Sequence, residues 1–237
     1  MKEGIKVSEH EASLIEAKTR KQSSSEEWKL QRQSRLTASN FGAICKSTDD
    51  RDMEIFCKSM HSPPNLIHVP AIRHGCTYES VALKKFSEMT GKTILPSGFC
   101  ILPRLPFLGA TPDGVVQDED AVIEVKCPFE GRSSKVNPGK NFTFLERVGS
   151  NGPIRLKRTH NYYYQLVGQM MLSRKNVGYF VVFTHQDLFY EKIELDKDFF
   201  NNAMLPKLKD FYDNIYCPYV ASVMKKKFLR DCTCEKP

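Results

Sequence analysis

The spacing of apolar residues changes several times along the chain, and each change predicts a different element. From Ala71 to Thr90 apolar residues recur every three or four positions and Gly91 follows directly, which predicts a long helix that ends there. A second apolar stripe predicts a helix over 159–173. Shorter apolar runs predict strands at 99–102, 108–111, 114–116 and 121–126, followed by a hairpin of 177–185 and 188–195.

The flanking segments are more polar. Residues 1–24 predict a loosely held helix or tail, and Ser25 is a suitable N-cap for a helix that runs through Arg35. A closing helix from about Lys197 is expected to be interrupted near its two prolines, Pro206 and Pro218.

The order of these elements predicts one α/β domain with a central mixed β-sheet flanked by helices. We expect the domain to span 25–225, between a polar N-terminal segment at 1–24 and a polar C-terminal tail at 226–237. The 237 residues are 41% hydrophobic, which is enough for a packed core.

The composition also favours some compartments over others. No apolar run approaches the roughly 18 residues of a membrane span, and the polar N-terminus does not resemble a signal peptide. Eight cysteines are scattered without a CxxC pair, so we expect reduced thiols in an intracellular, reducing compartment, nucleus or cytoplasm. Cys232 and Cys234 in the tail lack the second ligand pair of a zinc site.

Positive charge is concentrated in one part of the chain. The net charge is +7, yet residues 131–175 hold nine basic side chains and a single acidic one, Glu146. Much of this excess lies in 129–158, a stretch rich in Gly that predicts a long loop, and such loops are often functional. We expect the loop to contact phosphates, and a solvated loop is the alternative. The candidate contacts to a DNA backbone are Arg155, Lys157 and Arg158.

The segment before this loop has the residue types of a hydrolytic metal site. Asp113 lies in a Pro-Asp-Gly bend, and Glu124 and Lys126 are two apart on a predicted strand, so their side chains share one face. Two carboxylates joined by a hairpin offer oxygen ligands to a hard cation such as Mg²⁺. A neighbouring lysine can hold a metal-bound water. The alternative is an ordinary hairpin with a Glu–Lys surface pair.

Further short motifs accompany the hairpin. They are, in chain order, Trp28-Lys29-Leu30-Gln31-Arg32, Thr37-Ala38-Ser39, Tyr78-Glu79, Thr111-Pro112-Asp113-Gly114, Glu124-Val125-Lys126-Cys127-Pro128-Phe129 and Tyr162-Tyr163-Tyr164-Gln165. In these motifs and their order, residues 26–196 resemble the YqaJ-type viral recombinases, the lambda exonuclease family within the PD-(D/E)xK nuclease superfamily. The resemblance implies a restriction-endonuclease-like core, dependence on Mg²⁺ with Mn²⁺ as a substitute, and exonuclease action on duplex DNA from the 5′ end.

The resemblance also implies roles for single residues. The metal ligands would be Asp113, Glu124, Glu79 and the backbone carbonyl of Val125. Lys126 matches the catalytic lysine. Gln165 matches the glutamine of the last motif, with Gln169 one helical turn later as its rival.

Three further positions match those that hold a 5′-terminal phosphate, namely Arg32, Ser39 and Thr111. The family often has serine where this chain has Thr111, and the hydroxyl donor survives that change.

We therefore expect a Mg²⁺-dependent deoxyribonuclease, and foremost a 5′-to-3′ exonuclease on double-stranded DNA in recombination or DNA-end processing. The alternatives are a structure-specific endonuclease on the same fold and a catalytically inactive module that binds DNA ends. The expected partners are duplex DNA ends. A homo-oligomer, trimeric in some relatives, and a single-strand-annealing protein are further candidates that the resemblance suggests.

Overall fold

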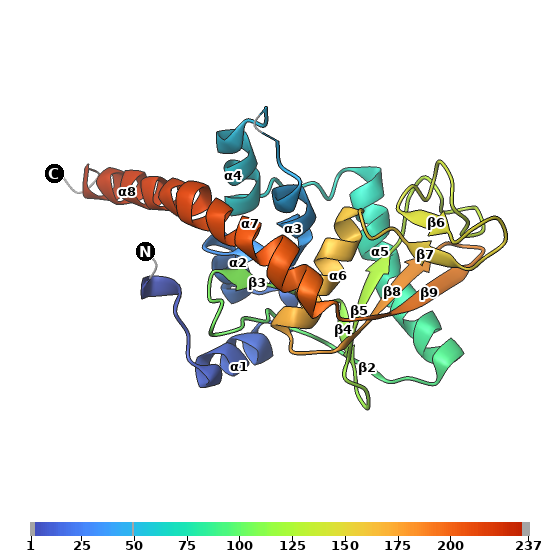
Figure 1. The fold of residues 1–237 in the computed structure, drawn as a ribbon. Coiled ribbons are helices and arrows are strands. Elements are labelled where there is room, and N and C mark those ends of the chain that lie inside the picture. The colour runs from blue at the N-terminus through green and yellow to red at the C-terminus, as the bar shows by residue number, and fades with distance from the viewer. Residues whose placement is uncertain (1–2, 49, 234–237) are drawn as a thin grey trace.

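The computed structural model describes residues 3–48 and 50–233 and is built around a five-stranded mixed sheet (Figure 1). The strand order is β2-β4-β5-β8-β9, in which only β5 and β8 run parallel. The strands are β2 Ile94–Leu95, β4 Gly114–Val116, β5 Ala121–Lys126, β8 Val177–Phe183 and β9 Leu188–Glu194. The predicted mixed sheet and its closing hairpin are confirmed.

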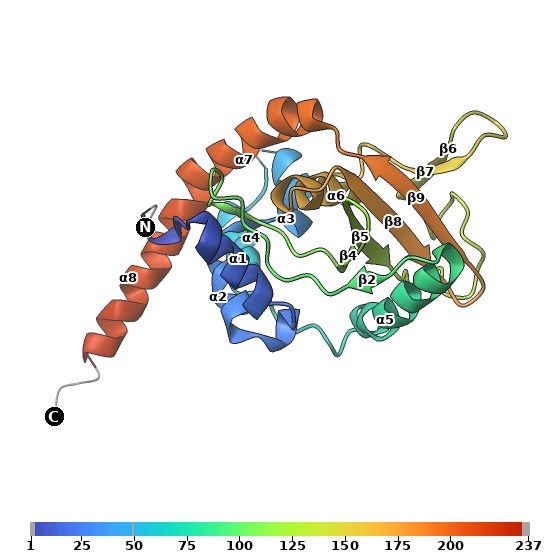
Figure 2. The same ribbon diagram turned by 90° about the horizontal axis from the view of Figure 1, so that it is seen from below.

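Helices cover both faces of this sheet (Figure 2). Helix α5, Pro70–Thr90, packs Phe86 against the face that carries Ile123 of β5. Helix α6, Asn161–Leu172, covers the opposite face together with α3, Ala38–Cys45. Because side chains alternate along β5, Ile123 faces α5 and Glu124 faces α6.

Helices α3 and α6 approach closely because each has a glycine at the contact. A Cβ added to Gly168 of α6 would lie 2.5 Å from the fully buried ring of Phe41 in α3. A Cβ added to Gly42 of α3 would lie 2.6 Å from the backbone of Asn161. The two glycines therefore let α3 and α6 lie close together on this face of the sheet.

A small parallel pair of strands lies beside the main sheet. Strand β1, Leu36–Thr37, pairs with β3, Leu108–Gly109, so that Thr37 lies opposite Gly109. The predicted strand at 99–102 is reduced to an isolated bridge between Cys100 and Ala110, whereas β2 was not anticipated.

The N-terminal segment is folded and packed, in contrast to the loose helix or tail that its polarity suggested. It contains helix η1 Glu3–Ile5, helix α1 Glu9–Lys18 and helix η2 Gln22–Ser24, and it leads into α2, Glu26–Gln33. Ile5 and Thr19 are buried, and the Ser25 hydroxyl caps α2 as predicted. Polarity misled because hydrogen bonds hold this segment as much as apolar contacts do.

The remaining elements lie at the edges of the core. The basic loop contains a hairpin of β6 Leu145–Arg147 and β7 Ile154–Leu156, and a short helix, α4, spans Met53–His61. The six described cysteine side chains are free thiols. None of the helices in the described ranges combines the length and apolar character that crossing a bilayer requires.

The C-terminal helical region is continuous, so the expected interruptions near the prolines are wrong. It runs through η3 Phe199–Met204, α7 Leu205–Phe211, η4 Tyr212–Tyr216 and α8 Cys217–Thr233. Pro206 and Pro218 each follow a π-helical turn, and a wider turn accommodates a residue that lacks an N–H donor.

Helix α8 extends away from the body of the molecule (Figures 1 and 2). It passes through the expected start of the tail at 226 and continues to Thr233. Of the cysteines in that tail, Cys232 is described only by its helical backbone, and Cys234 lies outside the described residues.

Two Gly-to-Ala substitutions, one at the contact between α3 and α6 and one away from it, should have opposite effects on stability. Gly168→Ala should destabilise the protein by about 1–3 kcal/mol, because the new methyl group overlaps the Phe41 ring. Gly75→Ala on α5, where an added Cβ meets nothing within 4 Å, should instead stabilise the protein by up to about 1 kcal/mol. Urea unfolding measures both values, and equal stability of the two variants would contradict the packing argument.

Candidate active site

The centre of the site is the buried carboxylate of Glu124 in β5. Its residue is only 2% exposed, and burying an ionised carboxylate is costly unless hydrogen bonds compensate it. Three donors do so. The Lys126 ammonium pairs with Oε1, Gln165 Nε2 donates to Oε1 at 2.6 Å, and Gln169 Nε2 donates to Oε2 at 2.6 Å.

Both glutamines lie on α6, one helical turn apart, so they reach the same carboxylate from one face. The sequence left Gln165 and Gln169 as rivals, and the structure brings both to Glu124. Gln169 also donates to the backbone carbonyl of Thr111 at 3.2 Å and is 1% exposed. It therefore connects the Glu124 carboxylate to the loop that precedes Asp113.

Asp113 lies at the start of the β4–β5 hairpin and faces the end of β5. Its Oδ2 accepts a hydrogen bond from the Val125 N–H at 2.7 Å. Strand β4 ends its pairing with β5 at Gly114, so Val125 has no strand partner on that side. Since the N–H and C=O of one strand residue point the same way, the Val125 carbonyl faces the same gap as Asp113.

Glu79 on α5 completes the group of carboxylates. It lines a cavity of about 320 Å³ together with Lys126 and Tyr162. Burial and the Glu124 carboxylate raise the pKa of Glu79, while Lys126 opposes the change. Burial, Glu124 and Glu79 together raise the pKa of Asp113 well above its ordinary value. The acidic residues are thus close enough to repel one another.

Lys126 is the cation of the site. Burial disfavours its charge, but the Glu124 and Asp113 carboxylates outweigh burial and raise the pKa of Lys126. Its Nζ lies 4.5 Å from the centre of the Tyr162 ring and 3.4 Å from Gln165 Oε1. The ammonium is therefore charged at neutral pH and held at the mouth of the cavity.

The oxygen ligands suit a hard divalent cation. In residues 3–48 and 50–233 no three His, Cys, Asp or Glu side chains already form a metal cluster. Both oxygens of Glu124 are engaged within the protein, one by Lys126 and Gln165 and the other by Gln169. Burial and the Glu124 and Glu79 carboxylates raise the pKa of Asp113, and a bound cation would offset both effects, so the residues present fit such an ion.

A second cluster, formed by Trp28, Arg32 and Thr111, lies next to these carboxylates. Trp28 Nε1 donates to Thr111 Oγ1 at 3.0 Å, and the Arg32 guanidinium stacks over the Trp28 ring at 4.2 Å. Burial lowers the pKa of Arg32 to about 10, so the group stays charged at neutral pH. Within the described residues the contact found for its guanidinium is the stack on Trp28, and it forms no hydrogen bond or ion pair there. A half-buried and unpaired guanidinium is suited to bind an anion.

Ser39 lies at the N-terminal end of α3 and is exposed. Thr37 and Gly109 are paired at the end of the two parallel strands β1 and β3. Helix α3 and the segment that leads to Thr111 therefore both begin at the same end of this small sheet. The Thr37 hydroxyl does not cap the helix and instead lies 3.1 Å from the Ser39 hydroxyl. Ser39 thus lies two residues after Thr37, and Thr111 lies two residues after its partner Gly109.

The three basic residues expected to bind DNA all have partners within the protein. Arg155 pairs with Glu146 across the β6–β7 hairpin at 2.7 Å, and Arg158 pairs with Asp196. Lys157 donates to the Thr143 carbonyl at 2.6 Å. They lie on β7 or just beyond it, and none of the three is among the residues that line the cavity beside Lys126.

Sequence reasoning did not anticipate two of the contacts that organise the site. The contact of Trp28 with Thr111 joins residues 83 positions apart, and no local signal reports it. The position of Tyr162 under Lys126 is similarly non-local, whereas its neighbour Tyr163 is buried in the core.

Comparison with known proteins identifies the family. YqaJ-like viral recombinase domains match residues 27–176. The chain belongs to the YqaJ-like viral recombinase family. This confirms the resemblance seen in the motifs, and with it the expectation of a nuclease at the level of family and fold. A search among curated proteins finds no significant match.

Several solved structures share the fold. The alkaline exonuclease LHK-Exo from Laribacter hongkongensis superposes with a TM-score of 0.62 at 22% identity, over 87% of this chain and 99% of that one. The shutoff and exonuclease protein from Kaposi's sarcoma associated herpesvirus gives 0.61 at 12% identity, over 90% and 73%. A phage-related exonuclease from Haemophilus somnus gives 0.53 at 15% identity, over 81% and 96%.

The crowding of carboxylates predicts how stability depends on pH. Because the pKa of Asp113 is raised in the folded protein, its charge opposes folding above that pKa, and the effect disappears once both states are protonated. Without divalent metal at pH 8, Asp113→Asn should raise Tm by roughly 2–4 °C, the change that about 1 kcal/mol brings in a domain of this size.

At lower pH the difference in Tm between Asp113→Asn and wild type should disappear, because the wild-type carboxyl then takes up a proton. Asp118→Asn, in the exposed β4–β5 turn, is the control and should leave Tm unchanged at both pH values. A lower Tm for Asp113→Asn at pH 8 in chelator would show that the burial and repulsion of this charge do not dominate the stability at this position.

Proposed function

We propose that this protein is a divalent-metal-dependent deoxyribonuclease that degrades duplex DNA from its 5′ ends. The observation that carries the proposal is the convergence of Asp113, Glu124 and Glu79 around the Lys126 ammonium in a member of the viral recombinase family. Structures of LHK-Exo with dAMP and of a SOX protein with DNA support nucleic acid as the ligand.

The ligands proposed for Mg²⁺, or for Mn²⁺ in its place, are the carboxylates of Asp113, Glu124 and Glu79 and the carbonyl of Val125. When bound, such an ion polarises the scissile phosphate and activates water. The protein supplies the geometry. The Val125 N–H orients the Asp113 carboxylate, and Gln165 and Gln169 orient Glu124.

Lys126 is proposed to act on the attacking water. Its charge is secured by the surrounding carboxylates, and Tyr162 limits where the ammonium can lie. A charged Lys126 beside the cavity also offers a counter-charge to the phosphate as the P–O bond to the 3′ oxygen breaks.

We propose that Arg32, Ser39 and Thr111 hold the 5′-terminal phosphate. Arg32 offers a planar fork of donors, and Trp28 keeps this fork in place while also bonding to Thr111. Because Gln169 joins the Thr111 carbonyl to Glu124, the distance from the terminal phosphate to the metal ligands is set by one continuous network.

The basic loop is proposed to meet the duplex backbone. It directly follows Pro128, which lines the cavity beside Lys126. Arg155, Lys157 and Arg158 belong to this proposal, but their internal partners reduce what they can offer to phosphates. Homo-oligomerisation, a single-strand-annealing partner and a reducing compartment are proposed from family membership and from the free thiols.

The decisive test uses variants that keep shape but remove ligands. Asp113→Asn and Glu124→Gln should reduce release of nucleotides from linear duplex DNA in Mg²⁺ by a hundredfold or more, while duplex binding persists, and Lys126→Ala should cost on the order of a hundredfold. Asp118→Asn serves as the control for charge. Near-wild-type turnover in Asp113→Asn would refute the metal site.

The same assay separates the alternatives. Cleavage of closed circular duplex at the rate of linear duplex would establish an endonuclease. Binding of DNA ends by wild type without release of nucleotides in Mg²⁺ or Mn²⁺ would establish a binding module.

The proposed end pocket predicts a preference among substrates. Wild type should degrade 5′-phosphorylated ends at least about tenfold faster than 5′-hydroxyl ends, as expected for the loss of a charge-assisted contact. Arg32→Ala should erase this preference by slowing the phosphorylated substrate. Arg20→Ala, on the exposed side of the N-terminal segment and paired with Glu16, is the matched control. A preference that survives in Arg32→Ala would exclude the pocket.

A further inference from the structure

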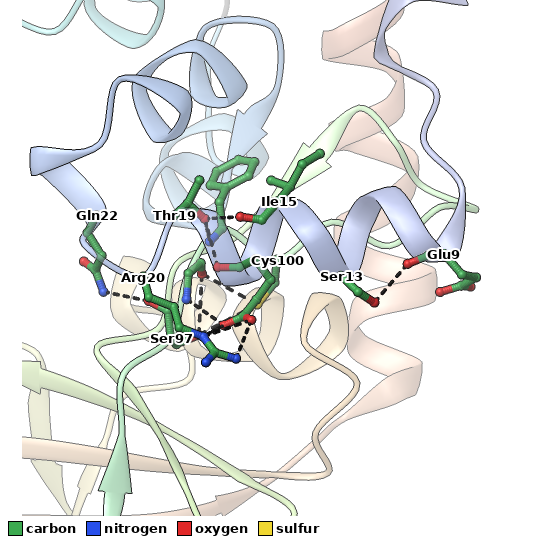
Figure 3. A network of polar contacts seen from close by, with 11 residues as sticks. Glu9, Ser13, Ile15, Thr19, Arg20, Gln22, Ser97 and Cys100 are labelled. Atoms are coloured by element: carbon green, nitrogen blue, oxygen red, sulfur yellow. Dashed lines mark hydrogen bonds and ion pairs between the residues drawn. The ribbon is translucent and has the colours of Figure 1, made fainter.

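Residues 3–24 precede the part of the chain that matches the family, yet they contact the segment that leads to Asp113 (Figure 3). The fully buried Thr19 hydroxyl accepts a hydrogen bond from the Phe99 N–H at 2.7 Å and donates to the Ile15 carbonyl at 2.6 Å. The Glu16 carboxylate accepts from the Gly98 N–H at 2.9 Å. These contacts fasten α1 to the segment at 97–99.

The approach is too close for any side chain at Gly98. A Cβ there would lie 1.8 Å from the Glu16 carbonyl oxygen and 2.7 Å from the Thr19 hydroxyl. The segment then pairs with Ala110 through both backbone bonds of Cys100, at 2.7 and 3.0 Å. The end of α1 is therefore held at a fixed position relative to Ala110, three residues before Asp113.

Gln22 makes the last contact of this segment with that loop. Its Nε2 donates to the carbonyls of Ser97 and Pro112, both at 3.2 Å. Its backbone has a φ of 45°, a left-handed conformation that glutamine seldom adopts. A strained residue that persists in a fold marks a position that its surroundings determine, and such positions cluster at functional sites.

The position of the second acceptor gives this contact its meaning. Pro112 is buried and directly precedes Asp113, and its carbonyl belongs to the peptide bond whose N–H is that of Asp113. That N–H, which points away from the carbonyl within the same peptide plane, donates to the Ile123 carbonyl at 3.1 Å. Hydrogen bonds on both sides of one peptide fix its rotation, and this rotation sets the direction in which the Asp113 side chain leaves the backbone.

We propose that Gln22 is a positioning residue for Asp113, which makes the N-terminal segment part of the metal site. Gln22 orients the Pro112–Asp113 peptide so that the Asp113 carboxylate and the Val125 carbonyl present their oxygens to the same cation. This assignment rests on the proposed function, because it presumes that Asp113 is a metal ligand. Docking of α1 itself belongs to Thr19 and Glu16, and Gln22 adds the orientation of the loop.

The left-handed backbone of Gln22 allows stability and positioning to be separated. Gln22→Gly removes the amide but relieves the backbone, and Gln22→Asn tolerates the same φ with an amide one methylene shorter. Both variants should keep or raise Tm. Both should weaken Mg²⁺ binding to the full-length, chelator-treated protein about three- to tenfold in calorimetry, as expected for the loss of one neutral hydrogen bond. The rate of nucleotide release at saturating DNA should fall with it.

Two further variants serve as controls. Ser23→Gly, at the exposed neighbouring position, should match wild type in Tm and in Mg²⁺ affinity. Thr19→Val, which removes the bond from the Phe99 N–H that helps to dock α1 and does not touch Pro112, should lower Tm.

The outcomes discriminate between the explanations. Wild-type Mg²⁺ affinity in Gln22→Gly would overturn the proposal, as would a loss of affinity accompanied by a fall in Tm like that of Thr19→Val, because Gln22 would then serve docking alone. If wild type binds Mg²⁺ but releases no nucleotides, the proposed function fails while the calorimetry still decides the role of Gln22. If wild type binds no divalent cation, both proposals fall together.

Discussion

The architecture of the site depends on keeping one charged carboxylate, that of Glu124, inside the protein. An ionised group at 2% exposure is tolerated only if donors surround it, and Lys126, Gln165 and Gln169 meet that demand. Two of these donors come from α6, so α6 must lie close over β5.

The same requirement connects parts of the protein that are distant in sequence. Gln169 links Glu124 to Thr111, and Thr111 accepts from Trp28, over which Arg32 is stacked. The residues proposed to hold a cation and those proposed to hold a terminal phosphate are therefore fixed by one set of hydrogen bonds. Such rigidity suits a reaction in which the scissile bond lies a set distance from the DNA end.

Several features of the site lower the stability of the metal-free protein. Asp113 and Glu79 are held near Glu124, where burial and then the repulsion between the carboxylates raise the pKa of both groups. Gln22 adds a left-handed backbone next to the same loop. Functional sites commonly retain such unfavourable features, and the two apolar clusters on either face of the sheet provide the stability that offsets them.

Local pattern was sufficient for the hairpin with Asp113, Glu124 and Lys126, because alternation along a strand is a property of neighbouring residues. It was sufficient for α5 and its end at Gly91 for the same reason. It failed for Pro206 and Pro218, where π turns keep the helix continuous, and for the polar residues before Ser25, which hydrogen bonds hold in place. The contacts of Trp28 and Gln22 span 83 and 90 positions, so only the packing of the whole chain decides them.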